Sequence, residues 1–352
     1  MPQFNPNDLK ILYAIQGTGN GHIARAMEII PLLKEYGEVD IVLSGDHKNI
    51  DFPMPIKYRS KGLSFAYNKN GGLSFLKTIF RNNIFQIIHE IFTFPIKDYD
   101  VVINDFEFIT AWSAKLNAVK SFGLGHQYAF LSKDCPRPAK IDKLGEWVLK
   151  NYAPVTKAIG FHFDTFDNFV YRPVIRKEVR ELEVSNEGYF TVYLPAYGDE
   201  YLKKYLSQIP EKRWEIFSKN CKEAYSYKNL HFKPTQNQAF VESLTKCEGI
   251  LCSAGFETPA EALYLGKKLF TIPIKNQYEQ YCNAAALESI GVGVSYSLNS
   301  QTIETIKDWA RDSEPLKINY PNQTKEIIRR EIFDEVRLSI LEKDINIERV
   351  IY

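Results

Sequence analysis

The stretch from residue 249 to residue 266 combines small, acidic and hydroxyl side chains in an order typical of a phosphate site. It reads Gly-Ile-Leu-Cys-Ser-Ala-Gly-Phe-Glu-Thr-Pro-Ala-Glu-Ala-Leu-Tyr-Leu-Gly. This order predicts a buried strand, a turn of small residues at 253–255 and a helix that begins near Thr258. Pro259 suits the first turn, and Thr258 with Glu261 is typical of a capping box. Because a helix N-terminus favours negative charge, and small residues let a diphosphate approach the backbone, we expect an anion site here.

A second helix start follows one strand later. After a predicted strand at 268–272, the segment Pro-Ile-Lys-Asn-Gln-Tyr-Glu-Gln-Tyr-Cys-Asn-Ala-Ala places Glu279, Gln280 and Asn283 near the beginning of a helix. The carboxyl ends of parallel strands meet at one edge of a sheet, so these side chains would point into the same crevice as the anion site. The alternative is structural, because capped helices after buried strands occur throughout α/β proteins and Glu261 could simply close its own box.

The amino-terminal part of the chain contains a glycine-rich loop. Gly17-Thr-Gly-Asn-Gly-His22 follows a predicted strand at 11–15. Its glycine spacing differs from the dinucleotide fingerprint, and it lacks the Gly-Lys-Ser/Thr of a P-loop. His22 would begin the next helix and face an interdomain cleft, with Arg25 on the same helical face. A histidine at a helix start can also be only a capping or surface residue.

These segments together resemble the signatures of the GT-B glycosyltransferases. The resemblance covers the UDP-glycosyltransferase superfamily and the bacterial N-acetylglucosaminyltransferase that makes the peptidoglycan lipid intermediate. Residues 255–261 resemble the donor motif, with a Gly, a hydroxyl residue three positions later and a Glu six positions later. Residues 279–284 resemble the polar–Gln pair followed by Asn-Ala, and residues 232–236 resemble the aromatic-x-Pro stretch near the base. Residues 17–25 are similar to the Gly-x-Gly-His-x-x-Arg opening of certain bacterial and archaeal members.

The resemblance implies a role for each matching residue. Glu261 would accept hydrogen bonds from the ribose hydroxyls, Phe232 would lie beside the base, and the diphosphate would lie at the turn before the helix. Ser253 stands where many UDP-glycosyltransferases have a phosphate-contacting His, so the resemblance supports the backbone site there more than this side chain. The residues that it assigns to the donor are Gly19, Gly21, Phe232, Ser253, Gly255, Phe256, Glu257, Thr258, Glu261, Glu279 and Gln280.

Sugar transfer requires an acceptor hydroxyl to lose its proton as it attacks the anomeric carbon. An imidazole that titrates near neutrality suits this task, and the resemblance makes His22 the base. An Asp that orients the imidazole improves it. We expect this to be Asp105, because it follows a predicted strand at 101–103; the alternative for Asp105 is a helix N-cap. Glu107 could likewise be structural. The residues assigned to acceptor binding are Arg25, Glu107, His126 and Gln127.

Strands and helices alternate along the chain, which indicates parallel sheets covered by helices. The length of 352 residues suits two such domains. The Arg- and Glu-rich region 172–185 has little apolar character and is interpreted as a linker. We therefore predict an α/β fold of the GT-B type, with two doubly wound Rossmann-like domains facing across a cleft. The acceptor domain would span 1–175, the nucleotide-sugar domain 186–320, and helices at 321–352 would return to the first domain.

The bulk composition excludes several functional classes. The 44 basic and 43 acidic residues nearly cancel, so no overall field would recruit nucleic acid. The five cysteines match no metal-binding spacing, and residues 1–8 lack the apolar core of a secretion signal. We therefore expect reduced thiols in a cytoplasmic protein. The sequence contains no run of eighteen apolar residues, so it predicts no membrane span.

Two further features have alternative interpretations. Apolar residues recur at helical spacing between 72 and 94, which favours a helix packed on the core. Alternatively, this helix would receive an apolar or lipid acceptor at the inner face of a membrane, flanked by Lys77 and Arg81. The acidic pair Asp98 and Asp100 precedes a strand, at the end remote from the expected cleft, so we do not assign it to a metal–diphosphate complex.

The sequence thus predicts transfer of a sugar from a nucleotide diphosphate sugar, UDP-linked by resemblance, to the hydroxyl of a carbohydrate, lipid or small-molecule acceptor. Direct displacement with inversion is expected. The helix N-terminus at 256–259 would meet the charge of the leaving group, so neither a metal nor another cofactor is expected. Two alternatives remain open: a nucleotide-sugar epimerase of the same fold, and a catalytically silent nucleotide-sugar-binding protein.

Overall fold

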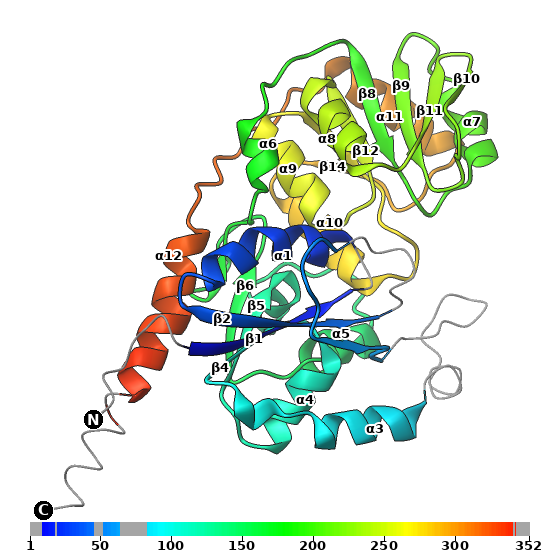
Figure 1. Cartoon of the computed structure of the whole chain (residues 1–352). Helices are drawn as coiled ribbons and strands as arrows, with labels where there is room; N and C mark the ends of the chain where they lie inside the picture. Colours follow the sequence, from blue (N-terminus) through cyan, green and yellow to red (C-terminus); the bar gives the residue numbers. More distant parts are fainter. Residues whose placement is uncertain (1–8, 18–19, 46–51, 64–82, 341, 343–352) are drawn as a thin grey trace, which may run out of the picture. The chain divides into compact units, whose positions relative to one another are not determined.

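The structure is a computed structural model that describes residues 9–17, 20–45, 52–63, 83–340 and 342 (Figure 1). It divides into two compact units. The first contains residues 1–132, 147–174 and 321–352, and the second contains residues 133–146 and 175–320. The boundaries differ from the predicted division, because residues 133–146 belong to the second unit although their neighbours on both sides belong to the first.

The first unit is built on a parallel sheet with seven strands among the described residues, in the order β3-β2-β1-β4-β5-β6-β7. Strands β1, β4 and β5 are almost entirely buried, which explains their continuous apolar runs. The strands are β1 (Leu9–Gln16), β2 (Gly37–Ser44), β3 (Tyr58–Ser60), β4 (Val101–Asp105), β5 (Ser121–Gly125), β6 (Lys157–Phe161) and β7 (Val170–Tyr171).

Helices cover both faces of this sheet, with α1 on one face and α3 and α4 on the other (Figure 1). The helical elements are α1 (Asn20–Leu33), α3 (Ile84–Thr93), η2 (Ile96–Asp98), α4 (Phe108–Leu116), η3 (His126–Leu131), α5 (Lys143–Asn151) and α12 (Thr324–Ile328). Helix α12 continues through a π-helical turn, η4 (Arg329–Phe333).

The carboxyl-terminal segment packs against the first unit. The ring of Phe333 stacks on Tyr36 just after α1, with ring centroids 3.7 Å apart. Lys157 Nζ lies 3.0 Å from a carboxylate oxygen of Glu331 and 2.6 Å from one of Glu335. Aromatic stacking and ion pairs therefore tie the end of the described chain to α1 and β6.

The second unit contains another sheet of seven described strands, in the order β10-β11-β9-β8-β12-β13-β14, parallel except for the β10–β11 hairpin. Its strands are β8 (Tyr189–Tyr193), β9 (Arg213–Ser218), β10 (Tyr225–Tyr227), β11 (Leu230–Pro234), β12 (Gly249–Cys252), β13 (Lys268–Thr271) and β14 (Gly293–Val294). Its helices are α6 (Lys177–Glu181), α7 (Asp199–Leu206), α8 (Asn237–Lys246), α9 (Glu257–Leu265), α10 (Tyr278–Ser289) and α11 (Ser300–Asp312).

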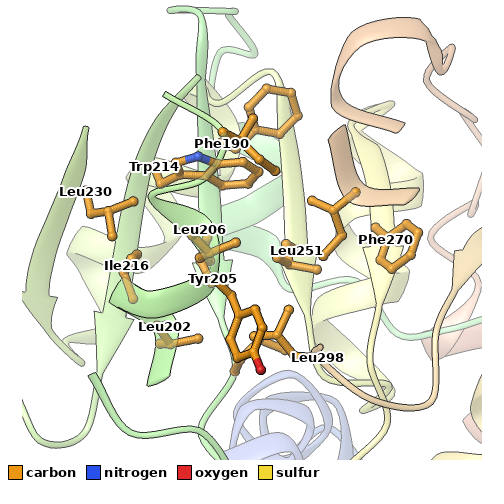
Figure 2. Close-up of a cluster of buried hydrophobic side chains, with 14 of the residues drawn as sticks. Phe190, Leu202, Tyr205, Leu206, Trp214, Ile216, Leu230, Leu251, Phe270 and Leu298 are labelled. Carbon is orange, nitrogen blue, oxygen red and sulfur yellow. The ribbon is translucent and has the colours of Figure 1, made fainter. Parts of the chain in front are cut away.

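The core of the second unit lies between the sheet and helices α7 and α11 (Figure 2). Strand residues Phe190, Trp214 and Leu251 meet Leu206 of α7 and Trp309 of α11 there, all with 8% exposure or less. Burying a large apolar side chain contributes about 1.5–3 kcal/mol, so this cluster stabilises the sheet to which β12 belongs.

Two sequence interpretations change in the structure. The region 172–185 is not a bare linker, because part of it forms α6 and packs within the second unit. Only the end of the helix expected at 72–94 lies among the described residues, as α3; Lys77 and Arg81 lie outside them. Two residues of α3, Ile87 and Ile91, are buried against α4, while Phe85 and Phe92 are exposed. None of the described helices is long and apolar enough to cross a membrane.

Candidate active site

His22 and Asp105 lie side by side in the first unit. His22 is in the first turn of α1, and Asp105 ends β4, which pairs with β1. Nδ1 of His22 lies 3.0 Å from Oδ1 of Asp105. The imidazole is 12% exposed and the carboxylate is fully buried. The carboxyl ends of two neighbouring parallel strands thus bring together the two residues that the sequence assigned to catalysis.

Arg25 holds the other side of the same carboxylate. Its Nε donates to Oδ2 of Asp105 at 3.1 Å, and its Nη2 donates to Oδ1 at 2.7 Å. Burial alone would raise the pKa of Asp105, but Arg25 and His22 outweigh this effect and hold the pKa below its ordinary value. Arg25 is itself only 3% exposed, and its guanidinium positions Asp105; its assignment to acceptor binding stays a prediction.

The neighbours of His22 select one tautomer of its ring. Nε2 of His22 lies 3.3 Å from the side-chain nitrogen of Gln127, which is a donor. A proton on Nδ1, donated to Asp105, leaves Nε2 free to accept from Gln127, and the opposite tautomer satisfies neither neighbour. Nδ1 of His22 and Nη2 of Arg25 lie 3.1 Å apart because both donate to the same oxygen, Oδ1 of Asp105. The lone pair of Nε2 therefore points away from Asp105, as a general base requires.

The local backbone keeps space for this arrangement. Gly125 ends β5, and a Cβ atom there would collide with Oδ1 of Asp105. Phe106, directly after Asp105, has a φ of +57°, a conformation that is strained for a non-glycine residue. Asn104 supports the turn, since its side chain donates to the Glu107 carbonyl at 2.8 Å and accepts from the Glu107 amide at 2.8 Å. The position of the Asp105 carboxylate is therefore fixed by the conformation of the turn that follows β4.

Two residues assigned to acceptor binding have structural roles. Glu107 is fully buried as the N-cap of α4, where its carboxylate accepts from the amides of Ile109 and Thr110. His126 is 1% exposed, and its Nδ1 lies 2.8 Å from the Phe161 carbonyl oxygen. Glu107 therefore has the structural role that was its alternative, and none of these contacts supports acceptor binding by either residue. Gln127 lies at His22, as described above.

A second candidate site lies within the second unit, at the carboxyl end of β12. The amide of Ser253 donates to the Tyr193 carbonyl at 3.1 Å, which continues the sheet into the turn 253–255. Helix α9 begins at Glu257 after Phe256, and Phe256 makes no side-chain capping bond. The predicted Thr258 N-cap and its capping box with Glu261 are therefore wrong, although the helix start lies where an anion site was expected. A Cβ at Gly255 would meet no atom within 4 Å, so the backbone is open to a ligand on that side.

Helix α10, which follows the neighbouring strand β13, supports this turn. The Asn283 side chain, fully buried, donates to the carbonyl oxygen of Ala254 at 3.1 Å. Gln280 is 7% exposed, and its Oε1 accepts from the Ile274 amide at 2.8 Å. Glu279, in the first turn of α10, is half-buried. The sequence predicted that Asn283 would point into the crevice of the anion site; in the structure its side chain is fully buried and supports the turn from behind.

The remaining donor assignments have mixed outcomes. Phe232 is fully buried in the core described above and stacks on Tyr225 at 4.7 Å, so its predicted place beside a base is wrong. Glu261 is buried and paired with Arg176. Gly19 lies outside the described residues, and Gly21 is half-buried in the first turn of α1. Glu257 and Thr258 are half-buried in the first turn of α9.

The acidic pair of the amino-terminal half lies away from these residues. Asp98 is in η2, and Asp100 accepts from the Lys10 amide at 2.8 Å, at the amino ends of β1 and β4. This is the edge of the sheet opposite to His22, as the sequence indicated. Within the described ranges, no three His, Cys, Asp or Glu side chains are grouped so that they could hold a metal ion.

Comparisons with known proteins identify the class. The model of the family described as glycosyl transferase family 1 matches residues 9–311. No curated protein matches the chain. Among solved structures, Arabidopsis thaliana UGT89C1 complexed with UDP has a TM-score of 0.58 and 13% identity, over 92% of this chain and 94% of that one. The glycotransferase of kitacinnamycin has a TM-score of 0.58 and 12% identity, over 88% and 92% of the two chains.

A bacterial structure shares the same architecture. Acinetobacter baumannii MurG has a TM-score of 0.50 and 15% identity, over 91% of this chain and 99% of that one. At such identities the structural matches establish the fold, which is the GT-B arrangement of two Rossmann-like α/β units, and the family match covers most of the chain. The chain belongs to glycosyl transferase family 1 and is a glycosyltransferase.

Proposed function

We propose that this glycosyltransferase moves a sugar from a nucleoside diphosphate sugar, UDP-linked, to an acceptor hydroxyl, with His22 as the general base. The observation that carries the proposal is the 3.0 Å contact between Nδ1 of His22 and the fully buried Asp105. It orients the ring so that Nε2 is the basic atom, in a side chain that is 12% exposed.

We propose that the reaction is a single displacement. The acceptor hydroxyl gives its proton to Nε2 of His22 while its oxygen forms a bond to the anomeric carbon. The bond from that carbon to the diphosphate oxygen breaks, and the nucleoside diphosphate leaves with the electron pair. Attack opposite the leaving group inverts the anomeric configuration. Before this step the acceptor must replace Gln127 at Nε2, 3.3 Å away.

The donor half supplies the stabilisation of the leaving group. The turn 253–255 and the start of α9 present backbone at the carboxyl end of a parallel strand, where the positive end of the helix dipole favours a diphosphate. The open space at Gly255 admits a phosphate close to the chain. We propose that this backbone site meets the negative charge without a metal ion.

Replacing His22 with Ala tests the assignment of the base. Transfer from UDP-sugar donors should fall by roughly 10²–10⁴-fold, the usual contribution of a general base, while UDP binding survives, because the donor half belongs to the other unit. Transfer is measured as UDP release, and UDP binding as a thermal shift. Unchanged transfer would show that His22 is not the base.

The same assays separate the alternative functions. Conversion of the donor without any acceptor and without UDP release would indicate an epimerase. Binding of UDP with neither transfer nor isomerisation would indicate a binding protein. Thermal-shift screening with UDP-, GDP-, dTDP- and CDP-sugars identifies the donor base, because a ligand that binds only the folded state stabilises it. Preference for a base other than uracil would overturn the UDP assignment.

A further inference from the structure

Arg176 makes a buried ion pair that no step of the proposed reaction uses. Its Nε donates to Oε1 of Glu261 at 2.6 Å, and its Nη2 donates to Oε2 at 2.8 Å. The side chains are 12% and 2% exposed. This two-pronged geometry matches the planar guanidinium to the planar carboxylate and fixes the orientation of both groups.

The guanidinium is itself held by two other elements. Its Nη1 donates to Oδ1 of Asn237, the first residue of α8, at 2.9 Å, and also to a carboxylate oxygen of Glu178 in α6. Arg176 directly precedes α6, and Glu261 is in α9. Three helices therefore converge on one guanidinium, and it has little freedom to leave Glu261.

The carboxylates around Arg176 oppose the ionisation of Glu261. Burial raises the pKa of Glu261 above its ordinary value, and Glu257 and Glu178 add to the rise. The hydrogen bonds and the charge of Arg176 act in the opposite direction. Arg176 is thus the cation that favours the charged form of Glu261, against its burial and the negative charges of Glu257 and Glu178.

We infer that Arg176 is a positioning residue for donor recognition: it orients the Glu261 carboxylate so that this group can accept hydrogen bonds from the ribose hydroxyls of the nucleotide. This inference rests on the proposed donor site. A carboxylate has about four lone-pair positions, and the fork of Arg176 takes two of them. The two that remain suit a vicinal diol, so the site should favour a ribose over a deoxyribose.

The test compares UDP with 2′-deoxy-UDP by calorimetric titration, in the wild type and in Arg176→Met. The wild type should prefer UDP roughly tenfold or more, which is what one hydrogen bond to a charged group contributes. The variant should lose most of this preference. Both ligands carry the same diphosphate and bind the same protein sample. Protonation of the phosphates and a general loss of folded protein therefore affect both affinities equally and leave their ratio unchanged.

The pH dependence of this ratio separates positioning from packing. In Arg176→Met, Glu261 keeps the burial that raises its pKa and loses the cation that lowers it, so it takes up a proton at a higher pH than in the wild type. The ribose preference of the variant should therefore fall as the pH decreases, over a range where the wild type keeps its preference. Arg176→Lys restores the charge without the fork, so it should restore most of the pH profile and only part of the preference.

Arg180→Met is the matched control. Arg180 lies in the same short helix, over the ring of Tyr264 at 4.8 Å, and donates to the Ile175 carbonyl. It makes none of the described bonds to Glu261, so its loss should leave the ribose preference and its pH profile unchanged. If Arg176→Met proves unstable, the double variant Arg176→Met/Glu261→Gln removes both charges and should also bind UDP and 2′-deoxy-UDP alike.

The possible failures are distinguishable. A ribose preference in Arg176→Met equal to that of the wild type at every pH would overturn the inference alone. Tighter UDP binding by Arg176→Met would also overturn it, because Arg176 would then occupy the ribose position. A wild type that does not bind UDP would overturn the proposed donor, and the inference with it.

Discussion

The carboxylate of Asp105 serves two cationic partners, and this sharing sets how it can support His22. Arg25 keeps the buried carboxylate ionised and holds its orientation through two hydrogen bonds. It also neutralises part of the charge that would otherwise attract the imidazolium formed during transfer. In the proposed reaction, the arrangement therefore serves mainly to orient the imidazole of His22. Removing Arg25 would leave the buried carboxylate without its guanidinium, which costs about 3–5 kcal/mol, whereas removing His22 leaves the two hydrogen bonds from Arg25 in place.

Gly125→Ala tests whether this geometry matters for catalysis. The added Cβ would overlap Oδ1 of Asp105, so the carboxylate must turn away from His22 or the strand must shift. Crowding of this kind costs about 1–3 kcal/mol of stability. We expect a fall of kcat by at least about tenfold, with little change in UDP binding, because no donor residue is touched. Steady-state kinetics and UDP titration measure the two effects.

A second glycine provides the control for this substitution. Gly198→Ala places a Cβ where no atom lies within 4 Å, at a position that belongs to neither candidate site, so the stability should stay within about 0.5 kcal/mol of the wild type and kcat should not change. Equal kcat values for Gly125→Ala and the wild type would show that the position of Asp105 is not critical.

The proximity of His22 and Asp105 was predictable from the sequence, whereas the contacts of several single side chains were not. Parallel strands bring their carboxyl ends to one edge, so residues following two strands can be placed together without a structure. The direction of one side chain depends on tertiary packing. Phe232 alternates into the core and Glu107 turns back to cap its own helix. Arg176 gave no sequence signal beyond belonging to an Arg- and Glu-rich region.

At the scale of elements, the donor half depends on two helix starts that follow neighbouring strands. Helix α9 begins without a side-chain cap, and the predicted capping box fails because Glu261 is paired with Arg176 instead. The turn before α9 is held from the side by Asn283 of α10. The order of strand, turn and helix could be predicted because small residues and Pro259 punctuate it. The partner of each polar side chain could not, because the partners come from distant elements.

Asn283→Ala tests the support of this turn. The substitution removes the 3.1 Å bond to the Ala254 carbonyl and leaves a buried acceptor unsatisfied, at a cost of about 1–3 kcal/mol. The turn 253–255 should loosen, so the KM for the donor should rise several-fold while kcat changes less. Ser289→Ala at the other end of α10, where the hydroxyl donates to the Ala286 carbonyl, is the control and should leave the KM unchanged. A donor KM equal in both variants would contradict a role for Asn283.

At the scale of the whole molecule, the two units are assembled from non-contiguous chain segments. The alternation of strands and helices predicted two α/β units, because hydrophobic runs of strand length recur between helical segments. Membership of 133–146 in the second unit carried no compositional signal. It rests on specific contacts: Arg137 pairs with Glu146 at 2.9 Å, and Tyr278 of α10 donates to Glu146 at 3.0 Å. Such contacts depend on the finished fold and not on local pattern.

The carboxyl-terminal helix gives a direct test of this division. Phe333 is 5% exposed and stacks on Tyr36 just after α1, the helix that carries His22 and Arg25. Phe333→Ala leaves a cavity and should cost about 3–5 kcal/mol. Amide hydrogen exchange should rise in α1 while exchange in α9 stays near the wild-type level, and UDP should still protect α9.

The reciprocal change completes the argument. Trp309→Ala removes a core ring that packs on Phe190 and Phe270 in the second unit, with centroids 5.1 Å and 5.6 Å away. Exchange should then rise in α9 and UDP protection should weaken, while α1 keeps its protection, because each unit has its own core. If Phe333→Ala raised exchange in α9 as strongly as in α1, the units would unfold as one cooperative body. The support that the carboxyl-terminal helix gives to α1 would then not be a property of the first unit alone.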